Sequence, residues 1–215
     1  QIAERHRASL QKITATSLLT LESNVAKSRK KVQFLHSTPP VMGISRAFNH
    51  GGIDPYDGTT TSQWISRLQT IFSAFIEANP EIRQIRYISR HNQGKEVIRV
   101  ERREGRVTVT PDELLQKKGD TDYYQAITQL HPSEDYLSDI TLNREYGIIE
   151  NPLWPTFRVA KPVFDDNYQF FGFIIVNIDA SQLLNDLQQQ FEHSAFELYI
   201  LNTQGFFILP PKPSL

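Results

Sequence analysis

The first 36 residues carry apolar and small side chains at alternating steps of three and four, and they contain neither glycine nor proline. The positions concerned are Leu10, Ile13, Ser17, Leu21, Val25, Ser28, Val32 and Leu35. Such spacing places them on one narrow seam of a helix, as in coiled coils. At 1.5 Å per residue the helix would be roughly 54 Å long. We therefore predict one helix over residues 1–36, which covers a domain core, leaves the membrane as a dimerising stalk, or does both.

The rest of the chain alternates short helical and strand-like runs. Thr38-Pro39-Pro40 ends the first helix, and helical spacing then predicts helices over 41–48 and 62–78. Runs at 82–89 and 96–101 flank a glycine-containing turn and predict a β-hairpin. Further strands are expected at 106–110, 136–140, 156–164 and 170–178, short helices near 111–113 and 123–130, a helix capped by Asp179, and a last hairpin over 196–209. The pattern predicts an α+β fold with an antiparallel sheet of about five strands.

Composition excludes some classes of function but does not identify the function of this chain. The 215 residues suit one or two domains, and a net charge of −1 gives no electrostatic reason to expect nucleic acid. The chain has no cysteine, which excludes disulfides and thiolate metal sites and is compatible with an oxidising compartment. No apolar run approaches the roughly 18 residues of a membrane span, and no signal peptide is visible. We expect an excised soluble piece of a longer protein whose missing parts include membrane spans.

Arginine is the first candidate for binding chemistry, because guanidinium groups suit carboxylates and phosphates. Four arginines lie in or next to strand-like runs: Arg86, Arg99, Arg144 and Arg158. Alternation along the strand places Arg86 and Tyr87 on opposite faces of the sheet. The alternative is that these arginines pair with Glu96, Glu145 or Glu150, or face water.

Tyrosines and one asparagine form the second candidate group. Tyr87, Tyr123, Tyr124 and Tyr136 each offer an apolar ring with a hydroxyl, which suits small polar ligands, and Ser138 follows in the same run as Tyr136. Asn177 interrupts an apolar strand, so its amide needs a partner. We expect Asn177 and Tyr136 to line one cavity, the alternative being an asparagine bonded to backbone at a strand end.

Catalytic and metal-binding patterns are weak. The six histidines are scattered and show no metal-ligand spacing, and no nucleophile or phosphate-loop motif occurs. Asp120, Asp122, Asp135 and Asp139 offer oxygen ligands for a cation, but they match no EF-hand pattern. We therefore expect no enzyme activity in this domain, no cofactor and no metal. A hydrolase that uses these loop carboxylates stays open as the alternative.

The order of elements between residues 120 and 184 carries a family resemblance. Asp122-Tyr123-Tyr124 precedes the strand at 136–140, then come Leu142-Asn143-Arg144-Glu145 and Gly147, and two further strands run into Asp179. This order resembles the double-Cache extracytoplasmic sensor domain over about residues 60–190. Members that bind amino acids carry an Arg-x-Trp-Tyr stretch and two aspartates, whose places here are taken by residues 121–124, Asn143 and Asn177, so the carboxylates that hold the ligand amine are missing.

The resemblance implies a complete set of expectations about organisation and function. It implies a long helix and connecting segment over 1–60, a membrane-distal ligand-binding module over 61–190, and part of a membrane-proximal module over 191–215. The segment 142–145 is typical of a group attached to histidine kinases and diguanylate cyclases. A small anionic or carboxylate-bearing ligand would bind between the sheet and residues 117–147 of a periplasmic, membrane-anchored homodimer. The remaining alternative is a ligand-free structural dimerisation module.

Overall fold

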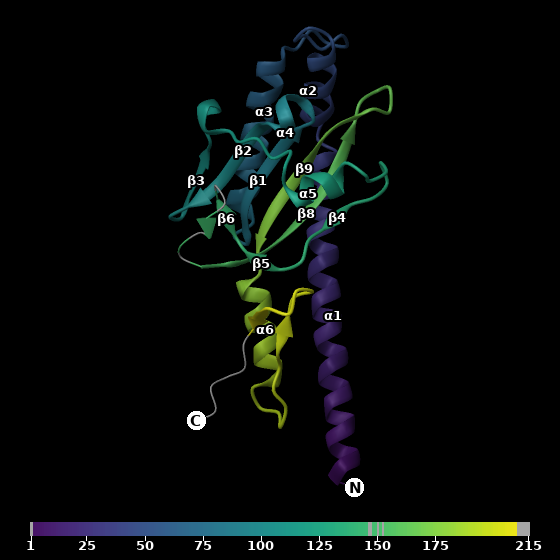
Figure 1. Ribbon diagram of the computed structural model, residues 1–215, viewed down its shortest axis with the longest axis vertical. Helices are drawn as coiled ribbons and strands as arrows, with labels where there is room; N and C mark the ends of the chain where they lie inside the picture. Colours follow the sequence, from purple (N-terminus) through teal and green to yellow (C-terminus); the bar gives the residue numbers. More distant parts are fainter. Residues whose placement is uncertain (1, 146–147, 150, 152, 210–215) are drawn as a thin grey trace. The chain divides into compact units, whose positions relative to one another are not determined.

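The computed structural model describes residues 2–145, 148–149, 151 and 153–209 (Figure 1). The chain divides into two compact units, each made of segments far apart in the sequence. The sheet unit comprises residues 29–138 and 158–178, and the terminal unit comprises 1–28, 139–157 and 179–215. The boundaries between the two units differ from the segment boundaries expected from the sequence, which are 1–60, 61–190 and 191–215. Gly147, Glu150 and residues 210–215, on which predictions also rested, lie outside the described residues.

The predicted N-terminal helix is confirmed as α1 (Ile2–His36). Four seam positions, Ser17, Ser28, Val32 and Leu35, are buried, whereas Leu10 near the start is exposed. Helix α2 (Pro39–Asn49) begins earlier than predicted, with both prolines in its first turn, where backbone N–H groups have no helical partner to lose. No helix in the described part of the chain is both long enough and apolar enough to cross a membrane.

Helix α3 (Thr61–Ala78) starts at a capping box. The Thr60 hydroxyl accepts a hydrogen bond from the Gln63 backbone N–H, and the Gln63 side chain accepts one from Thr60 N–H at 2.9 Å. Two N–H groups that the helix leaves unpaired are thereby satisfied. It contacts α2 as well as β1, β2 and β3, and Trp64 and Leu68 are buried, with the Trp64 ring against Gly43 of α2.

The described residues form a seven-stranded antiparallel sheet in the order β3-β2-β1-β9-β8-β4, with β5 paired to β8. Its strands are β1 (Ile82–Ser89), β2 (Glu96–Arg103), β3 (Arg106–Val109), β4 (Tyr136–Leu137), β5 (Thr141–Leu142), β8 (Pro155–Phe164) and β9 (Phe170–Asp179). The sheet has two strands more than the five or so expected: β3 corresponds to the strand predicted at 106–110, and β5 was not predicted. The predicted strand 136–140 is reduced to the two residues of β4.

The two faces of the sheet have different partners. Tyr87 on β1 points towards α2, where its hydroxyl donates a hydrogen bond to the Val41 carbonyl at 3.1 Å. On the other face, α5 (Asp122–Ile127) packs Tyr124 and Ile127 against Phe173 of β9. The short helix η1 (Asp112–Leu114) precedes α5, and the turn α4 (His91–Gly94) joins β1 to β2.

Besides residues 2–28 of α1, the terminal unit contains short hairpins and a second helix. Its further elements are β6 (Arg144–Glu145), β7 (Ile148–Ile149), α6 (Ser181–Phe191), β10 (Ile200–Leu201) and β11 (Phe207–Leu209). Ala180 is the N-cap of α6, while the Asp179 carboxylate, predicted as the cap, still accepts a hydrogen bond from Ser181 N–H at 2.9 Å. Ser17 of α1 donates to the Gln190 amide oxygen of α6 at 2.7 Å, so the α1 seam is used within the chain.

Candidate functional site

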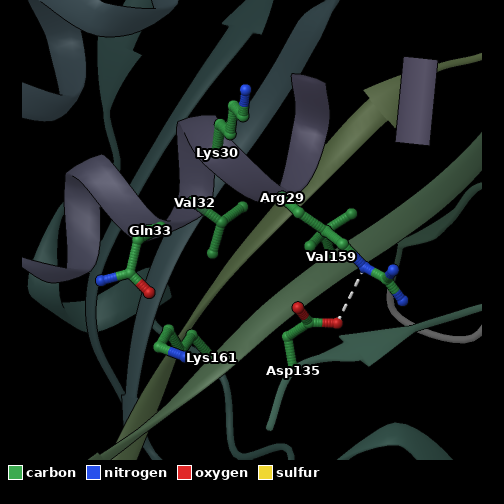
Figure 2. Close-up of a pocket in the computed structure, with 7 residues that line it drawn as sticks. All are labelled: Arg29, Lys30, Val32, Gln33, Asp135, Val159 and Lys161. Carbon is green, nitrogen blue, oxygen red and sulfur yellow. Dashed lines mark ion pairs between the residues drawn. The ribbon is translucent and has the colours of Figure 1, made fainter. Parts of the chain in front are cut away.

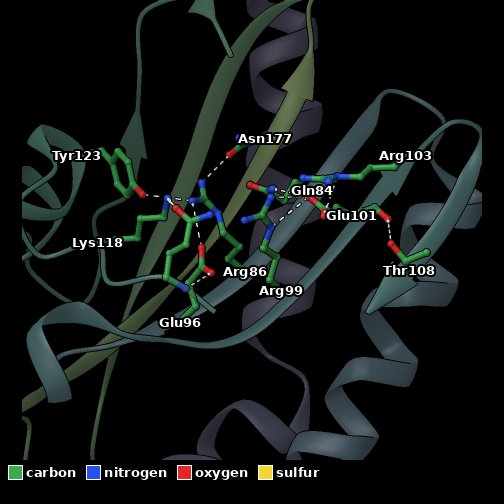
Figure 3. A network of polar contacts seen from close by, with 11 residues as sticks. Gln84, Arg86, Glu96, Arg99, Glu101, Arg103, Thr108, Lys118, Tyr123 and Asn177 are labelled. Carbon is green, nitrogen blue, oxygen red and sulfur yellow. Dashed lines mark hydrogen bonds and ion pairs between the residues drawn. The ribbon is translucent and has the colours of Figure 1, made fainter. Parts of the chain in front are cut away.

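One face of the sheet carries a buried polar cluster (Figure 3). Alternation along β1 places Gln84 and Arg86 on this face, and the register sets Arg86 opposite Arg99 of β2 and Gln84 opposite Asn177 of β9. Arg86 is 3% exposed and Arg99 is 1% exposed. Two guanidinium groups directly opposite each other would be destabilising without nearby carboxylates. We call Gln84, Arg86, Glu96, Arg99, Glu101, Tyr123 and Asn177 the Arg86 cluster.

Arg86 connects four elements through its guanidinium group. It donates to the Asn177 amide oxygen at 3.0 Å and to the Tyr123 hydroxyl at 3.2 Å. Its Nη1 lies 3.6 Å from Oε1 of Glu96, and its centre lies 5.6 Å from the Tyr123 ring centroid. A guanidinium group has the planar, forked shape that recognises carboxylates and other planar anions. Here it lies where water has little access.

Glu96 connects the cluster to residues 116–124, which we call the covering segment. Its Oε2 accepts a hydrogen bond from the Gln116 backbone N–H at 2.9 Å, and its Oε1 is buried without a hydrogen bond among the described residues. Next along the segment, the Lys118 ammonium donates to the Gln116 side chain at 2.6 Å. The alternative expected from the sequence, an Arg86–Glu96 ion pair, is therefore present alongside the arrangement suited to binding.

Arg99 has its own carboxylate partner. The Glu101 Oε2 accepts two hydrogen bonds from Arg99, at 2.6 and 3.1 Å, and one from the Gln84 amide at 3.0 Å. Arg103, which is half exposed, lies 2.9 Å from the other Glu101 oxygen. The buried part of the cluster thus holds two arginines and two glutamates, and the charges balance.

Aromatic side chains border the cluster on the same face. The Tyr123 and Tyr124 rings meet Phe173 edge to face, with centroids 6.4 and 5.6 Å apart, and Tyr136 packs against the same apolar group. Burial raises the pKa of the Tyr124 hydroxyl. Tyr123 differs because its hydroxyl is within hydrogen-bonding distance of Arg86.

Two close glycines hold the covering segment in place. Asn92, Gln93 and Gly94 all have positive φ, a conformation favoured only by glycine. Gly119 N–H donates to the Gln93 carbonyl at 3.0 Å, and Lys118 N–H donates to the Gly94 carbonyl at 2.9 Å. A side chain at Gly119 would place its Cβ 2.7 Å from that Gln93 oxygen, so the close approach requires glycine.

Several residues predicted for the site lie elsewhere. Tyr87 is fully buried on the opposite face of the sheet, so it is not part of the Arg86 cluster. Burial there raises the pKa of its hydroxyl well above the ordinary value. The Ser138 hydroxyl accepts a hydrogen bond from the Arg158 backbone N–H at 2.8 Å, which is a sheet-edge contact. Arg144 belongs to the terminal unit, where it is exposed.

Arg158 remains near the predicted face, because alternation along β8 places it with Ala160, which packs beside Phe173 and Ile175. The sequence reasoning named Glu96 only as a possible partner and did not name Gln84, Glu101 or Lys118 as site residues. Alternation along the predicted strands already places Gln84 on the face of Arg86, and along the second strand of the hairpin the same signal could have found Glu101. Within the described residues, no group of three His, Asp or Glu side chains is arranged to hold a metal ion.

Comparison with known proteins identifies the kind of domain. A family model described as the sensor domain of bacterial histidine kinases matches residues 56–214. No curated protein matches the chain. A domain of a protein described as of the sensory box/GGDEF family from Vibrio parahaemolyticus aligns with a TM-score of 0.70 at 17% identity, covering 99% of this chain and 74% of that one.

Two other solved structures share the fold at low identity. The extracellular domain of a protein described as a histidine kinase gives a TM-score of 0.60 at 17% identity, covering 97% of this chain and 71% of that one. The ligand-binding domain of the Campylobacter jejuni chemoreceptor Tlp3, solved with L-valine, gives 0.64 at 11% identity, covering 96% and 71%. The predicted α+β sensor fold and the resemblance to Cache-type sensor domains are confirmed.

Proposed function

Because this chain belongs to the family of bacterial histidine kinase sensor domains, we propose that it detects a small carboxylate-bearing molecule at the Arg86 cluster. The observation that carries the proposal is the Arg86 guanidinium, buried in the sheet face yet bonded to Asn177 and Tyr123. A ligand carboxylate would take the place of these neutral partners. An arginine offers the paired N–H groups that a carboxylate needs.

The stability of the fold does not by itself explain such a cluster. Buried ion pairs are often no more stabilising than well-packed apolar side chains of similar volume. Arg86 and Arg99 lie opposite each other in the middle of an apolar sheet, each requiring its own glutamate. A binding role explains why four charged side chains are buried there despite the cost in stability. It supports Arg86, Tyr123 and Asn177 as ligand-binding residues.

Glu96 adds a second feature to the proposed ligand. The aspartates that hold the ligand amine in amino-acid-binding Cache domains are absent from this chain. The Glu96 carboxylate lies 3.6 Å from Arg86 and could hold an ammonium group beside a bound carboxylate. The chemoreceptor Tlp3 has been solved with L-valine and with isoleucine, so amino acids belong in any screen alongside simple carboxylates.

The place of this domain in a receptor follows from the same family. We propose that it lies outside the bacterial inner membrane, is anchored by flanking membrane helices, and forms a homodimer through α1. The segment 191–215 would begin a membrane-proximal module. The output would be a histidine kinase or a diguanylate cyclase. A ligand would act by binding two arrangements of the segment 116–124 with different affinity.

A ligand-free structural module is the second candidate. The observation in its favour is that each buried arginine already meets a glutamate, so the cluster is charge-balanced without a ligand. Such a module would show no ligand-dependent change in stability. This outcome separates it from the sensor.

The test compares L-valine with its two single-group relatives, isovalerate and isobutylamine, by thermal shift and calorimetry. The proposal expects L-valine, isovalerate or both to bind, and isobutylamine not to bind. Arg86→Lys and Tyr123→Phe should weaken that binding, while Arg144→Lys, an exposed arginine in the terminal unit, serves as the control. Binding of isobutylamine alone, unchanged by Arg86→Lys, would overturn the proposal.

A further inference from the structure

A partly open hollow lies between helix α1 and strand β8 (Figure 2). Its volume is about 170 Å³. One wall is formed by Arg29, Lys30 and Gln33 of α1, and the other by Asp135 and Lys161. All of these residues belong to the sheet unit. None of them is part of the Arg86 cluster.

The floor of the hollow is apolar. Val32 is 1% exposed and Val159 is 0% exposed, and both side chains line it. A water molecule occupies about 30 Å³ in the liquid, so the space is sufficient for roughly five or six groups of that size. A short alkyl chain would fit over the two valines, against which its own apolar surface would be removed from water.

The rim of the hollow is cationic. Arg29 is committed to Asp135, with Nε 3.0 Å from the carboxylate. Lys161 donates only a long bond of 3.4 Å, to the Glu134 carbonyl. Among the described residues, the Lys30 and Gln33 side chains have no hydrogen-bond or ion-pair partner. In Figure 2, Lys161 and Gln33 lie on one side of the hollow and the Arg29–Asp135 pair lies on the other.

We propose that this hollow binds a small organic anion, a short-chain carboxylate, with its alkyl part over Val32 and Val159. Three cations against one carboxylate favour an anion over a cation, and Lys161 with the Gln33 amide supplies donors that the fold leaves available. The bound carboxylate competes with Asp135 for the rim cations. Since the two walls belong to α1 and to the sheet, the anion adds a bridge between them.

His36 provides a readout close to the hollow. It lies one helical turn beyond Val32, and its Nε2 donates to the Pro162 carbonyl at 2.9 Å. Burial lowers the pKa of the His36 imidazole, and the charge of Lys161 contributes in the same direction. An anion held at Lys161 opposes that charge, so its binding raises the pKa of His36. This change can be followed by NMR at the imidazole itself.

The experiment titrates the protein with butyrate, butylamine and inorganic phosphate at constant ionic strength. Butyrate in the millimolar range should raise the pKa of His36, butylamine should not, and phosphate should bind more weakly because it lacks the alkyl part. Lys161→Gln should weaken butyrate binding by about 1.4- to 5-fold, the range for an exposed ion pair. Asp135→Asn, which removes the competing carboxylate, should strengthen it by a similar factor.

Two controls separate this site from general electrostatics and from the Arg86 cluster. Lys27→Gln changes an exposed cation of α1 that does not line the hollow and should leave butyrate binding unchanged. Butyrate is itself a carboxylate that the proposed function allows at the Arg86 cluster, so the effect of Arg86→Lys is read only at His36. The butyrate-dependent rise in the His36 pKa should stay unchanged in this variant, so this inference and the proposed function can fail separately. The proposal is overturned if Lys27→Gln weakens butyrate binding as much as Lys161→Gln does, or if Asp135→Asn weakens it. It is also overturned if phosphate binds as strongly as butyrate, or if butyrate leaves the His36 pKa unchanged.

Discussion

Arg86 on β1 and Asn177 on β9 are joined across the sheet by a 3.0 Å hydrogen bond between the guanidinium and the amide oxygen. Both side chains are buried. The amide that interrupts the apolar strand β9 therefore has a charged partner. The sequence predicted a cavity shared with Tyr136 or a backbone bond at a strand end, and it did not predict a bond to Arg86. Asn177 and Arg86 thus form one polar unit inside the sheet.

This bond makes the Asn177 amide important for stability. Asn177→Leu removes an acceptor from a buried guanidinium, which should cost about 1.5–3 kcal/mol of unfolding free energy. Urea unfolding would measure it, with Asn167→Leu in the exposed turn after β8 as the control. In Arg86→Met/Asn177→Leu the loss should be smaller than the sum of the two single losses; additive losses would show that the residues are not coupled.

Tyr123 and Tyr124 offer a matched pair of substitutions. Tyr123→Phe removes a hydroxyl that accepts from Arg86 but keeps the ring below the guanidinium, so it should cost about 1 kcal/mol. Tyr124→Phe removes a hydroxyl that has no hydrogen-bond partner among the described residues and that still reaches solvent at the edge of a buried ring, so stability should change little. Denaturant unfolding of both variants checks the difference. An equal loss in both would contradict the role assigned to Tyr123.

The sequence predicted the local elements well because each has a periodic or capping signal of its own. The long helix α1, helix α3 and the β1–β2 hairpin all depend on residues close together in the chain. The Arg86–Asn177 contact joins residues 91 positions apart. Such a pair depends on the order and register of distant strands, which tertiary packing decides.

Glu96 shows a second limit of pattern reasoning. Tyr87 pairs with Ile98, but the register shifts so that Ile88 pairs with Glu96. Simple alternation along β2 would place Glu96 with Ile98, on the face away from Arg86. The irregularity redirects it towards Arg86, as bulges commonly do for a side chain near a site. No local sequence pattern gave the position of this bulge.

The covering segment should depend on Gly119. Gly119→Ala would place a Cβ 2.7 Å from the Gln93 carbonyl, a backbone atom that cannot turn aside. The hydrogen bond between these two residues should therefore break, and unfolding free energy should fall by about 1–3 kcal/mol, the usual cost of overpacking. Hydrogen exchange should show faster exchange at the Lys118 and Gly119 amides. Exchange as slow as in the unchanged protein would mean that the turn adapts without losing the contact.

Helix α1 should behave as one continuous element. Proline at Val25 would remove a helical hydrogen bond and clash with the preceding turn, costing about 3 kcal/mol or more. Val25→Ala removes a similar part of the side chain without affecting the backbone and serves as the control. The melting temperature should fall clearly for Val25→Pro only. If both variants melt together with the unchanged protein, this part of α1 contributes nothing to the stability of the folded chain.

His36 makes stability depend on pH in a stated direction. Burial, assisted by the charge of Lys161, lowers the pKa of this imidazole below its ordinary 6.5, although the hydrogen bond to the Pro162 carbonyl opposes the shift. The unfolded chain therefore takes up a proton at a higher pH than the folded chain. Stability is fully present above about pH 6.5 and is lost as the pH falls towards the folded pKa.

Burial also lowers the pKa of His91, so the two histidines act in the same direction. His36→Gln removes one of these titrations, and it should reduce the loss of unfolding free energy between about pH 8 and about pH 5.5, with His91 supplying part of what remains. Urea unfolding at a series of pH values measures both slopes. His36→Gln/His91→Gln should flatten the profile further. If the unfolding free energy of His36→Gln falls with pH as steeply as that of the unchanged protein, the His36 imidazole takes up its proton freely in the folded state.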